Sequence, residues 1–340
     1  MDFLVGKSLS EIESFLEEMG EMKYRGRQIY EWIYVHRIHE FDLMTNLSKS
    51  LRSRLSKLFL INPLKIKEIN ISVDGSKKYL FELYDGNLIE SVYIPERNWS
   101  TVCISSQVGC ALGCKFCATG KMGFIRDLNP GEIVGQLLHV LRKEKLGKRR
   151  INVVFMGMGE PLLNFENVMA AYSLITDPEG ISISRRRVTI STAGIIPSLE
   201  RLKEMDKLPK LAISLNGATD DVRSFLMPVN KKYPLKELVR LCKNLPLQRG
   251  ERITFEYVLF KDINDALEDA KRLAGLLHPG WAKVNLIPYN PIGEELHPSP
   301  IEKILRFQEF LLKRGFVATI RDSKGRDISG ACGMLAANSK

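Results

Sequence analysis

Residues 101–120 read TVCISSQVGCALGCKFCATG and carry three cysteines, Cys110, Cys114 and Cys117, in a C-x3-C-x2-C pattern. The β-branched run before them predicts a strand, so the cysteines lie on the loop that follows it. Three thiolates at this spacing can ligate three irons of a four-iron cubane and leave the fourth iron open. A zinc site needs a fourth ligand, which folding could bring from His139. Three unlinked free thiols are the remaining alternative.

After residue 101 the chain alternates short β-branched runs with amphipathic stretches. The runs are TVCISS, INVVFM, VTIST, KLAISL, ITFEYVLF and KVNLIP. This alternation predicts six strand–helix units, in either an open doubly wound sheet or a partial barrel. In both arrangements the chemistry lies at the carboxyl ends of the strands. The cysteines follow the first strand, residues 157–161 (GMGEP) follow the second, and Ser191 and Ser214 end the third and fourth. We therefore predict a single active site at that edge.

The first 95 residues follow a different pattern. Ser8 and Glu11 match a capping box, and the apolar spacing predicts helices near residues 8–20, 28–36 and 47–58. Three strand-like runs follow, IKEINIS, KKYLFEL and NLIESVYIP, and an Asp-Gly turn between the last two indicates a hairpin. We therefore predict a small α+β domain over residues 1–95 and an α/β domain over residues 96–340.

The composition excludes several classes of protein. The 340 residues are 44% hydrophobic and 26% charged, which excludes a disordered chain, a collagen-like fibre and a small disulfide scaffold. No apolar run approaches the ~20 residues that span a bilayer, and the acidic first stretch does not resemble a signal peptide, so we expect a cytoplasmic protein without a membrane partner. Fifty Lys and Arg against 40 Asp and Glu give a net charge of +10, which suits a nucleic-acid partner without requiring one. Candidate phosphate-binding positions are Lys23, Arg25, Arg27, the run 143–150, the run 185–187, Lys231 and Lys232.

Seven ordered segments resemble the RlmN and Cfr family of radical SAM rRNA adenine methyltransferases. They are IESVYIPE, residues 101–120, GMGEPLLN, RRVTISTAG, LAISLNGA, LIPYNP and GACG, and the similarity extends over residues 22–336. The C-x3-C-x2-C loop matches the cluster signature of the superfamily, and GMGEP resembles its GGEP segment. The resemblance implies an α/β fold, namely a partial (βα)6 radical SAM barrel with a small N-terminal α+β accessory domain that docks RNA.

The resemblance also implies the reaction and its cofactors. Cys110, Cys114 and Cys117 would hold a [4Fe-4S] cluster, and two molecules of S-adenosylmethionine (SAM) would be used per turnover. The target in this family is an adenosine of 23S rRNA, methylated at C2 in RlmN and at C8 in Cfr; some members also methylate the adenosine 3′ of the tRNA anticodon. We expect C2 chemistry, with C8 as the alternative that the sequence does not exclude. A flavodoxin- or ferredoxin-type electron donor and a monomeric protein are expected as well.

Three residues take catalytic roles by resemblance. Cys332, in the GACG segment, would carry the methyl group as S-methylcysteine, and Cys103 would resolve a protein–RNA adduct through a transient disulfide with Cys332. Glu90 would accept the proton from the adenine ring. Without the resemblance, Cys103 is a packed strand residue, Cys332 an inert thiol and Glu90 a solvated strand residue. Cys242, within an amphipathic stretch, is expected to be core packing.

The SAM contacts implied by the resemblance are Gly159, Glu160, Ser191, Ser214, Leu215, Asn216 and Asn290. Glycine permits close backbone approach, and Glu160 can pair with the SAM ammonium group. Asn216 departs from the family, which commonly has His after Ser-Leu. A backbone contact at this position would survive the change, but a role for an imidazole would not. Ser191 and Ser214 could instead cap strand ends.

Two other functions remain open at this point. A radical SAM enzyme that acts on another protein or a small molecule would have the three-cysteine loop but no need for both Cys103 and Cys332. A non-catalytic metal-binding or electron-transfer module would show four protein ligands and no SAM pocket.

Overall fold

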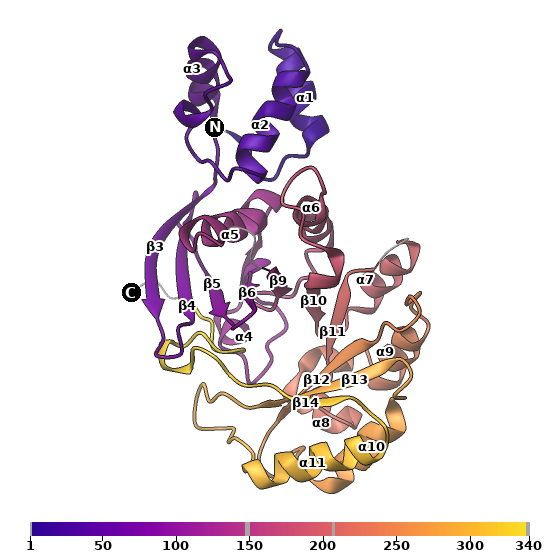
Figure 1. Cartoon of the computed structure of the whole chain (residues 1–340). Helices are drawn as coiled ribbons and strands as arrows, with labels where there is room; N and C mark the ends of the chain where they lie inside the picture. The colour runs from indigo at the N-terminus through magenta and orange to yellow at the C-terminus, as the bar shows by residue number, and fades with distance from the viewer. Residues whose placement is uncertain (1, 147–149, 206–207, 338–340) are drawn as a thin grey trace.

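The computed structural model describes residues 2–146, 150–205 and 208–337, and one ten-stranded sheet dominates it (Figure 1). The strands lie in the order β14-β13-β12-β11-β10-β9-β6-β5-β4-β3. Their bounds are β3 (Leu64–Ile71), β4 (Lys77–Leu83), β5 (Leu88–Pro95), β6 (Trp99–Cys103), β9 (Arg150–Phe155), β10 (Val188–Thr192), β11 (Lys210–Ser214), β12 (Ile253–Leu259), β13 (Ala282–Pro288) and β14 (Ala318–Ile320).

Of the described strands, β6 and β9 to β14 run parallel and follow one another in chain order. A doubly wound sheet reverses its direction at a switch point, whereas a barrel winds one way, so this order identifies a partial barrel. The predicted α/β class and its six strand–helix units are confirmed. The short β14 is a further parallel strand that was not predicted, because three residues carry too little periodic pattern.

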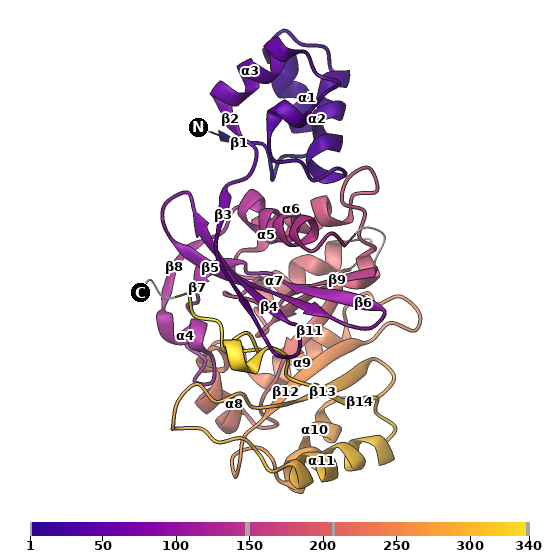
Figure 2. The same cartoon turned by 60° about the vertical axis from the view of Figure 1, so that its left-hand side comes forward.

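Helices connect the parallel strands and pack against the sheet (Figure 2). Helix α5 begins with Pro130 after a capping box between Asn129 and Glu132. The bounds are α4 (Ala118–Met122), α5 (Pro130–Lys143), α6 (Phe165–Thr176), α7 (Ile196–Arg201), α8 (Asp220–Leu226), α9 (Leu235–Lys243), α10 (Leu267–Leu276) and α11 (Ile301–Lys313).

The first helices form a separate unit at the top of Figure 1. This helical unit contains α1 (Leu9–Glu18), α2 (Tyr24–Tyr34) and α3 (Lys49–Leu58), with a short parallel pair of β1 (Asp2–Phe3) and β2 (Phe59–Leu60). The capping box between Ser8 and Glu11 forms as predicted. Helix α2 begins at Tyr24 rather than near residue 28, since its first turn packs closely against α1 through Gly26.

The predicted hairpin strands extend the barrel sheet. β3, β4 and β5 pair antiparallel, and β5 also pairs antiparallel with the first barrel strand, β6. Residues 64–95 therefore share a sheet with the barrel, while the helical unit stands apart from it. The domain boundary at residues 95 and 96 stays a prediction.

A second small hairpin flanks the cysteine loop. It pairs β7 (Gln107–Gly109) with β8 (Phe124–Asp127) and was not predicted, because its strands are too short to show alternation. No helix among the described residues is long and apolar enough to cross a membrane.

Candidate active site

The three cysteines of the C-x3-C-x2-C loop line one cavity, hereafter the thiol cavity. Its empty volume, open mouth included, is about 740 Å³. Burial raises the pKa of the Cys110 thiol to about 12 and also raises the pKa values of Cys114 and Cys117. Such thiols keep their protons at neutral pH until a metal displaces them. The donor set therefore fits a metal centre whose binding releases protons.

The three thiols do not converge on one point. In the described parts of the chain, no three His, Cys, Asp or Glu side chains gather closely enough to hold a single metal ion. A cubane holds its irons at separate corners, so thiols spread around a cavity fit a four-iron cluster better than one zinc ion. His139, the possible fourth zinc ligand, has Nε2 3.1 Å from the carbonyl oxygen of Leu64 and packs against Phe81 instead.

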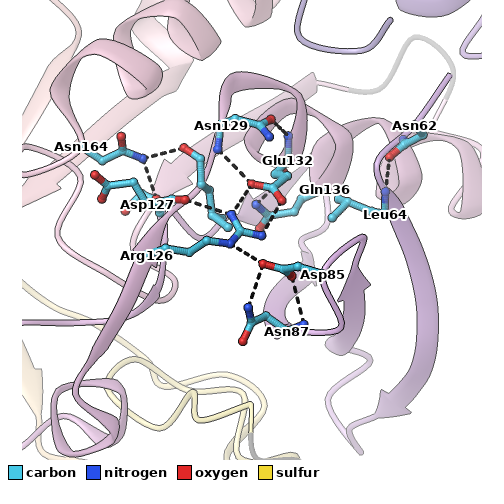
Figure 3. Close-up of polar contacts among 12 residues, drawn as sticks. Asn62, Leu64, Asp85, Asn87, Arg126, Asp127, Asn129, Glu132, Gln136 and Asn164 are labelled. Atoms are coloured by element: carbon cyan, nitrogen blue, oxygen red, sulfur yellow. Dashed lines mark hydrogen bonds and ion pairs between the residues drawn. The ribbon is translucent and has the colours of Figure 1, made fainter. Parts of the chain in front are cut away.

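Arg126 of β8 anchors the hairpin that carries the cysteine loop (Figure 3). Its Nε lies 2.6 Å from Oδ2 of Asp85 in the β4–β5 turn, and its Nη2 lies 2.7 Å from Oε1 of Glu132 at the start of α5. The hydrogen bond from Arg126 lowers the pKa of Asp85 to about 2. These contacts join a hairpin, a turn and a helix, so the loop has a fixed position relative to the barrel.

The segment 157–161 follows β9 and lines the thiol cavity. Gly159 has φ of +97°, and a Cβ there would lie 2.5 Å from Cβ of Gln107, so only glycine fits. Glu160 is 4% exposed, and its two oxygens accept the N–H groups of Leu162 and Ala193 at 3.0 and 2.8 Å. Burial raises the pKa of Glu160, against the effect of these bonds. A carboxylate has about four acceptor positions, so capacity for an ammonium group remains.

Of the four predicted SAM contacts at the ends of β10 and β11, two line the thiol cavity and two do not. Ser191 and Ser214 line the cavity, because adjacent parallel strands end at one edge. Leu215 is fully buried and does not line it. Asn216 has φ of +56°, and its Oδ1 accepts the N–H of Val258 at 2.8 Å. The turn after β11 thus directs the Asn216 side chain to β12 instead of the cavity.

Residues 331–337, hereafter the C-terminal loop, dock beside the cysteines. The N–H of Ala118 donates to the carbonyl of Gly333 at 2.7 Å, and Oγ1 of Thr119 donates to the carbonyl of Leu335 at 2.6 Å. Both donors lie in α4, which begins directly after Cys117. The loop therefore brings Cys332, Gly333 and Leu335 to the wall of the thiol cavity.

Asn290 holds the C-terminal loop and is absent from the walls of the thiol cavity. Its Nδ2 donates to the carbonyl of Cys332 at 3.2 Å, and its Oδ1 accepts from Nε of Arg326 at 2.9 Å. The predicted contact of Asn290 with SAM stays a prediction.

Glu90 also contacts this loop and lines neither of the cavities at Cys332. Its Oε2 accepts the N–H of Ala336 at 2.9 Å, and its Oε1 lies 2.9 Å from Nζ of Lys78. The carboxylate is therefore paired and only 4% exposed, rather than solvated. Its predicted role as proton acceptor stays a prediction.

Cys332 lies between two cavities. It lines the thiol cavity and a second cavity, whose empty volume, open mouth included, is about 500 Å³ and which Cys103 also lines. Burial, with Cys332 nearby, raises the pKa of Cys103 to about 12, and burial raises that of Cys332 to about 11 against the opposing charge of Arg321. Cys332 nevertheless keeps an exposed surface, because it faces the cavities. Folding thus brings together two thiols that lie far apart in the sequence.

Two charged residues of the site were not predicted. Glu256 of β12 lines the thiol cavity, and its Oε1 lies 3.6 Å from a guanidinium nitrogen of Arg321, which lines the second cavity. The sequence could have indicated Glu256, because a glutamate inside the apolar run ITFEYVLF is expected to be buried, and a buried carboxylate needs a partner or a function. Arg321 gave no signal, because it follows the three-residue strand β14.

Arg223 of α8 supports the thiol cavity from within the core and was not predicted either. It is fully buried, and its guanidinium donates to the carbonyl of Ala193 at 2.5 Å, to that of Ser214 at 3.4 Å and to Oδ1 of Asn230 at 2.7 Å. Burial lowers the pKa of Arg223 to about 10. The side chain thereby ties together the ends of β10 and β11.

The predicted phosphate-binding positions are scattered over the molecule. Arg27 is paired with Glu179 at 2.6 Å, which reduces its availability for RNA. Part of the run 143–150, residues 147–149, lies outside the described residues. Arg185–Arg187 lie just before β10, at the amino end of the barrel strands and away from the thiol cavity.

Known proteins similar to this chain agree with these features. Residues 104–274 match the radical SAM superfamily, and residues 3–61 match the ribosomal RNA large subunit methyltransferase N-terminal domain. The chain is 47% identical to the dual-specificity RNA methyltransferase RlmN of Syntrophotalea carbinolica, over 96% of this chain and 88% of that protein. It is 44% identical to the protein of the same name from Campylobacter curvus, over 100% and 95% of the two chains. A radical SAM methyltransferase from Sphaerobacter thermophilus has a similar crystal structure, with a TM-score of 0.95 and 41% identity over 99% of this chain and 100% of that one.

Proposed function

This chain belongs to the RlmN family of radical SAM enzymes, and from that premise we propose that it methylates C2 of an adenosine in 23S rRNA and the adenosine 3′ of a tRNA anticodon. The relatives are named dual-specificity RNA methyltransferases, which supports RNA as the substrate and two kinds of target. The observation that carries the proposal is the position of Cys332 between the thiol cavity and Cys103. A radical SAM enzyme without a methyl carrier on the protein has no need for that pair.

The thiol cavity has the side chains to hold both cofactors. Cys110, Cys114 and Cys117 would ligate three irons of a [4Fe-4S] cluster, and the SAM contacts would come from Gly159, Glu160, Ser191 and Ser214. When bound, the cluster and SAM supply a carbon radical, which C2 of adenine requires because it is an electron-poor carbon without a lone pair. We propose that Leu215 and Asn216 contribute to SAM binding through their backbone, and that Asn290 acts through the loop that it holds.

Cys332 is the proposed methyl carrier. Its thiol would lose a proton as Sγ accepts a methyl group from a first SAM, which gives S-methylcysteine and releases S-adenosylhomocysteine. Because burial raises the pKa of the Cys332 thiol to about 11, little thiolate is present at neutral pH. The positive charge of Arg321 acts in the opposite direction and favours the thiolate. Cys332 lines both cavities, so its thiol would receive the methyl group at one of them and meet Cys103 at the other.

Cys103 is the proposed resolving thiol. A carbon radical from a second SAM would take one hydrogen atom from the carried methyl group, and the methylene carbon would then join C2. The adduct would lose the C2 proton to Glu90 and one electron to the cluster. The Cys103 thiolate would then attack Sγ of Cys332. An S–S bond forms as the S–C bond breaks, and the released carbon takes up a proton, which frees the methylated RNA. Since both thiols line one cavity, this exchange needs no large movement of the barrel. A reductant must then open the disulfide before the next turnover.

Glu90 is the proposed acceptor of the C2 proton. Its carboxylate is bound by the N–H of Ala336 and by Lys78, so it would have to release Ala336 in order to reach an adenine base. Proton removal would then be coupled to a movement of the C-terminal loop. We also propose that the enzyme works as a monomer and receives electrons from a flavodoxin- or ferredoxin-type protein.

Mass spectrometry of nucleosides tests the proposed function. The reconstituted enzyme is incubated with unmodified 23S rRNA or tRNA and with SAM that carries a trideuterated methyl group. We expect 2-methyladenosine from both RNAs, with two deuterium atoms in the new methyl group, because one is removed while Cys332 carries it. If 8-methyladenosine is the only product, the enzyme methylates C8 and not C2. If the new methyl group retains three deuterium atoms, the proposed role of Cys332 as methyl carrier is contradicted. Absence of methyladenosine would overturn the proposed function.

A further inference from the structure

A large cavity lies at the end of the barrel opposite to the thiol cavity. Its empty volume, open mouth included, is about 1090 Å³, and its walls come from the amino ends of β11, β12 and β13 and from the turn before β10. Lys210 begins β11 and shares a face of that strand with Ser214. Lys283 lies beside Thr254, which shares a face of β12 with Glu256. Because Ser214 and Glu256 line the thiol cavity, both cavities open on the inner face of the barrel.

The wall of this second-end cavity, hereafter the basic cavity, is strongly cationic. Its described lining residues include six cationic side chains and one carboxylate, Glu251. Glu251 lies 3.0 Å from Arg185, so these two charges neutralise each other. The other five cations form no ion pair with any carboxylate in the described parts of the chain; they are Arg186, Lys210, Arg249, Arg252 and Lys283.

Three of these cations crowd one another. Lys210, Arg252 and Lys283 stand at the starts of three neighbouring strands, and neighbouring strands are ~4.8 Å apart. Burial lowers the pKa of Lys283, and the charges of Lys210 and Arg252 lower it further against the opposing charge of Glu256. Such repulsion destabilises the free protein and is relieved when an anion binds. A concave wall of mutually repelling cations is therefore suited to an anionic ligand.

Phosphate groups fit this wall better than carboxylates do. A phosphate presents several charged oxygens, which can accept hydrogen bonds from two or three cations at once, and a guanidinium group binds it in a bidentate manner. A carboxylate has a single charge and two oxygens, and so would leave most of the five cations unpaired. Phosphates also repeat along an RNA strand and within a polyphosphate, so that cations on neighbouring strands can meet neighbouring groups.

We propose that the basic cavity, with Lys210, Arg252 and Lys283 at its centre, is a phosphate-binding site separate from the SAM pocket. It shares no lining residue with the thiol cavity. The phosphates belong either to the backbone of a bound RNA or to a free polyphosphate, and two probes distinguish these sources. The site goes beyond the proposed methyl transfer and does not depend on it.

Binding of two probes to the full-length protein tests this site. The probes are tripolyphosphate and a 20-nucleotide oligouridine, which has no adenosine to methylate. Isothermal titration compares the unaltered protein with Lys210→Gln/Arg252→Gln. We expect the affinity for at least one probe to fall about tenfold or more in the variant, because charge-assisted hydrogen bonds are lost. For oligouridine, the slope of log affinity against log salt should decrease by about 1 to 2.

A variant on helix α9 is the matched control. Lys236→Gln/Lys243→Gln removes the same two charges from exposed positions outside the basic cavity. If Lys210→Gln/Arg252→Gln loses affinity for tripolyphosphate alone, the ligand is a free polyphosphate. If it loses affinity for oligouridine alone, the ligand is the RNA backbone. Loss of affinity for both probes identifies a site that accepts either. The proposal is overturned if the affinity for neither probe depends on Lys210 and Arg252, or if the α9 variant loses as much affinity as the Lys210→Gln/Arg252→Gln variant. Circular dichroism checks that each variant folds, and Lys210→Gln alone replaces the double variant if that one does not.

Discussion

The two ends of the barrel differ in how their charges are compensated. At the carboxyl ends of the strands, Glu160 accepts two backbone N–H groups and Glu256 lies 3.6 Å from Arg321. At the amino ends, Lys210 and Lys283 stand among other cations, and neither forms an ion pair with a carboxylate among the described residues, although the charge of Glu256 acts on Lys283. Both ends open on the same inner face of the same strands, so the difference comes from the side chains and not from the topology.

This difference separates an end suited to chemistry from an end suited to binding. Paired groups hold fixed positions, and catalysis benefits from dipoles that need no rearrangement. Unpaired like charges gain stability only when a counter-ion or ligand enters. Truncation of a side chain should therefore be harmful at the carboxyl end and nearly neutral at the amino end.

The largest effects are expected from the two thiols at the carboxyl end. Cys332→Ala and Cys103→Ala should each lower turnover by at least about a thousandfold, because each removes a covalent step. Only Cys103→Ala should accumulate RNA crosslinked to the protein, visible on a denaturing gel, since it forms the adduct but cannot resolve it. The control Cys242→Ala, at a buried core position, should keep turnover and lose about 1 kcal/mol of stability. Free methylated RNA from Cys103→Ala would contradict the assigned role.

The next largest effect is expected from the buried guanidinium beneath that end. Arg223→Met should lower the free energy of unfolding by about 3 kcal/mol or more, because the carbonyl groups of Ala193 and Ser214 lose a buried donor. Urea unfolding measures the change. Arg240→Met, at an exposed position of α9, should stay within about 0.5 kcal/mol. Equal losses in the two variants would show that burial of Arg223 does not stabilise the carboxyl end.

Two glycine substitutions should change the stability of the protein in opposite directions. Gly333 has φ of +83°, and a Cβ there would lie 3.1 Å from the carbonyl oxygen of Phe116, so Gly333→Ala should cost about 1–2 kcal/mol. Gly275 lies in α10 with open space around it, so Gly275→Ala should stabilise the protein by about 0.5–1 kcal/mol. Thermal unfolding measures both. No loss in Gly333→Ala would mean that the C-terminal loop is not held rigidly at the cavity.

The smallest effect is expected at the amino end. Lys210→Ala should leave the free energy of unfolding within about 0.5 kcal/mol of the original, or slightly above it at low salt, because the substitution removes a repulsion. High salt should abolish any gain. Chemical unfolding at two salt concentrations measures this, and a clear loss of stability would remove the contrast between the two ends.

Most of the fold could be predicted because its local patterns agree with its topology. The six main barrel strands are β-branched runs separated by amphipathic helices, and the box at Ser8 and Glu11 marks where α1 begins. The strands β7, β8 and β14 could not be predicted in this way. They contain three or four residues, and hydrogen bonds to a partner strand define them rather than any periodic pattern.

The candidate site could be predicted where the strand topology determines it. Glu160, Ser191 and Ser214 line the thiol cavity because neighbouring parallel strands end at the same edge. Asn216 lies two residues further along than Ser214, and its left-handed backbone turns the side chain towards Val258. That direction depends on the pairing with β12, which no local pattern reveals. The contact of Glu90 with Ala336 is likewise a matter of tertiary folding.

The contacts of the last described segment also order events during synthesis. Ala336 pairs with Glu90, Gly325 with Asp74, and Asp327 with Ser72, across 246, 251 and 255 positions of the chain. On the ribosome, the hairpin strands and the cysteine loop therefore emerge long before the segment that closes over them. Until that segment appears, the helix that follows Cys117 also lacks its hydrogen bonds to Gly333 and Leu335. The nascent chain thus presents the proposed cluster ligands first and gains Cys332, the proposed methyl carrier, last.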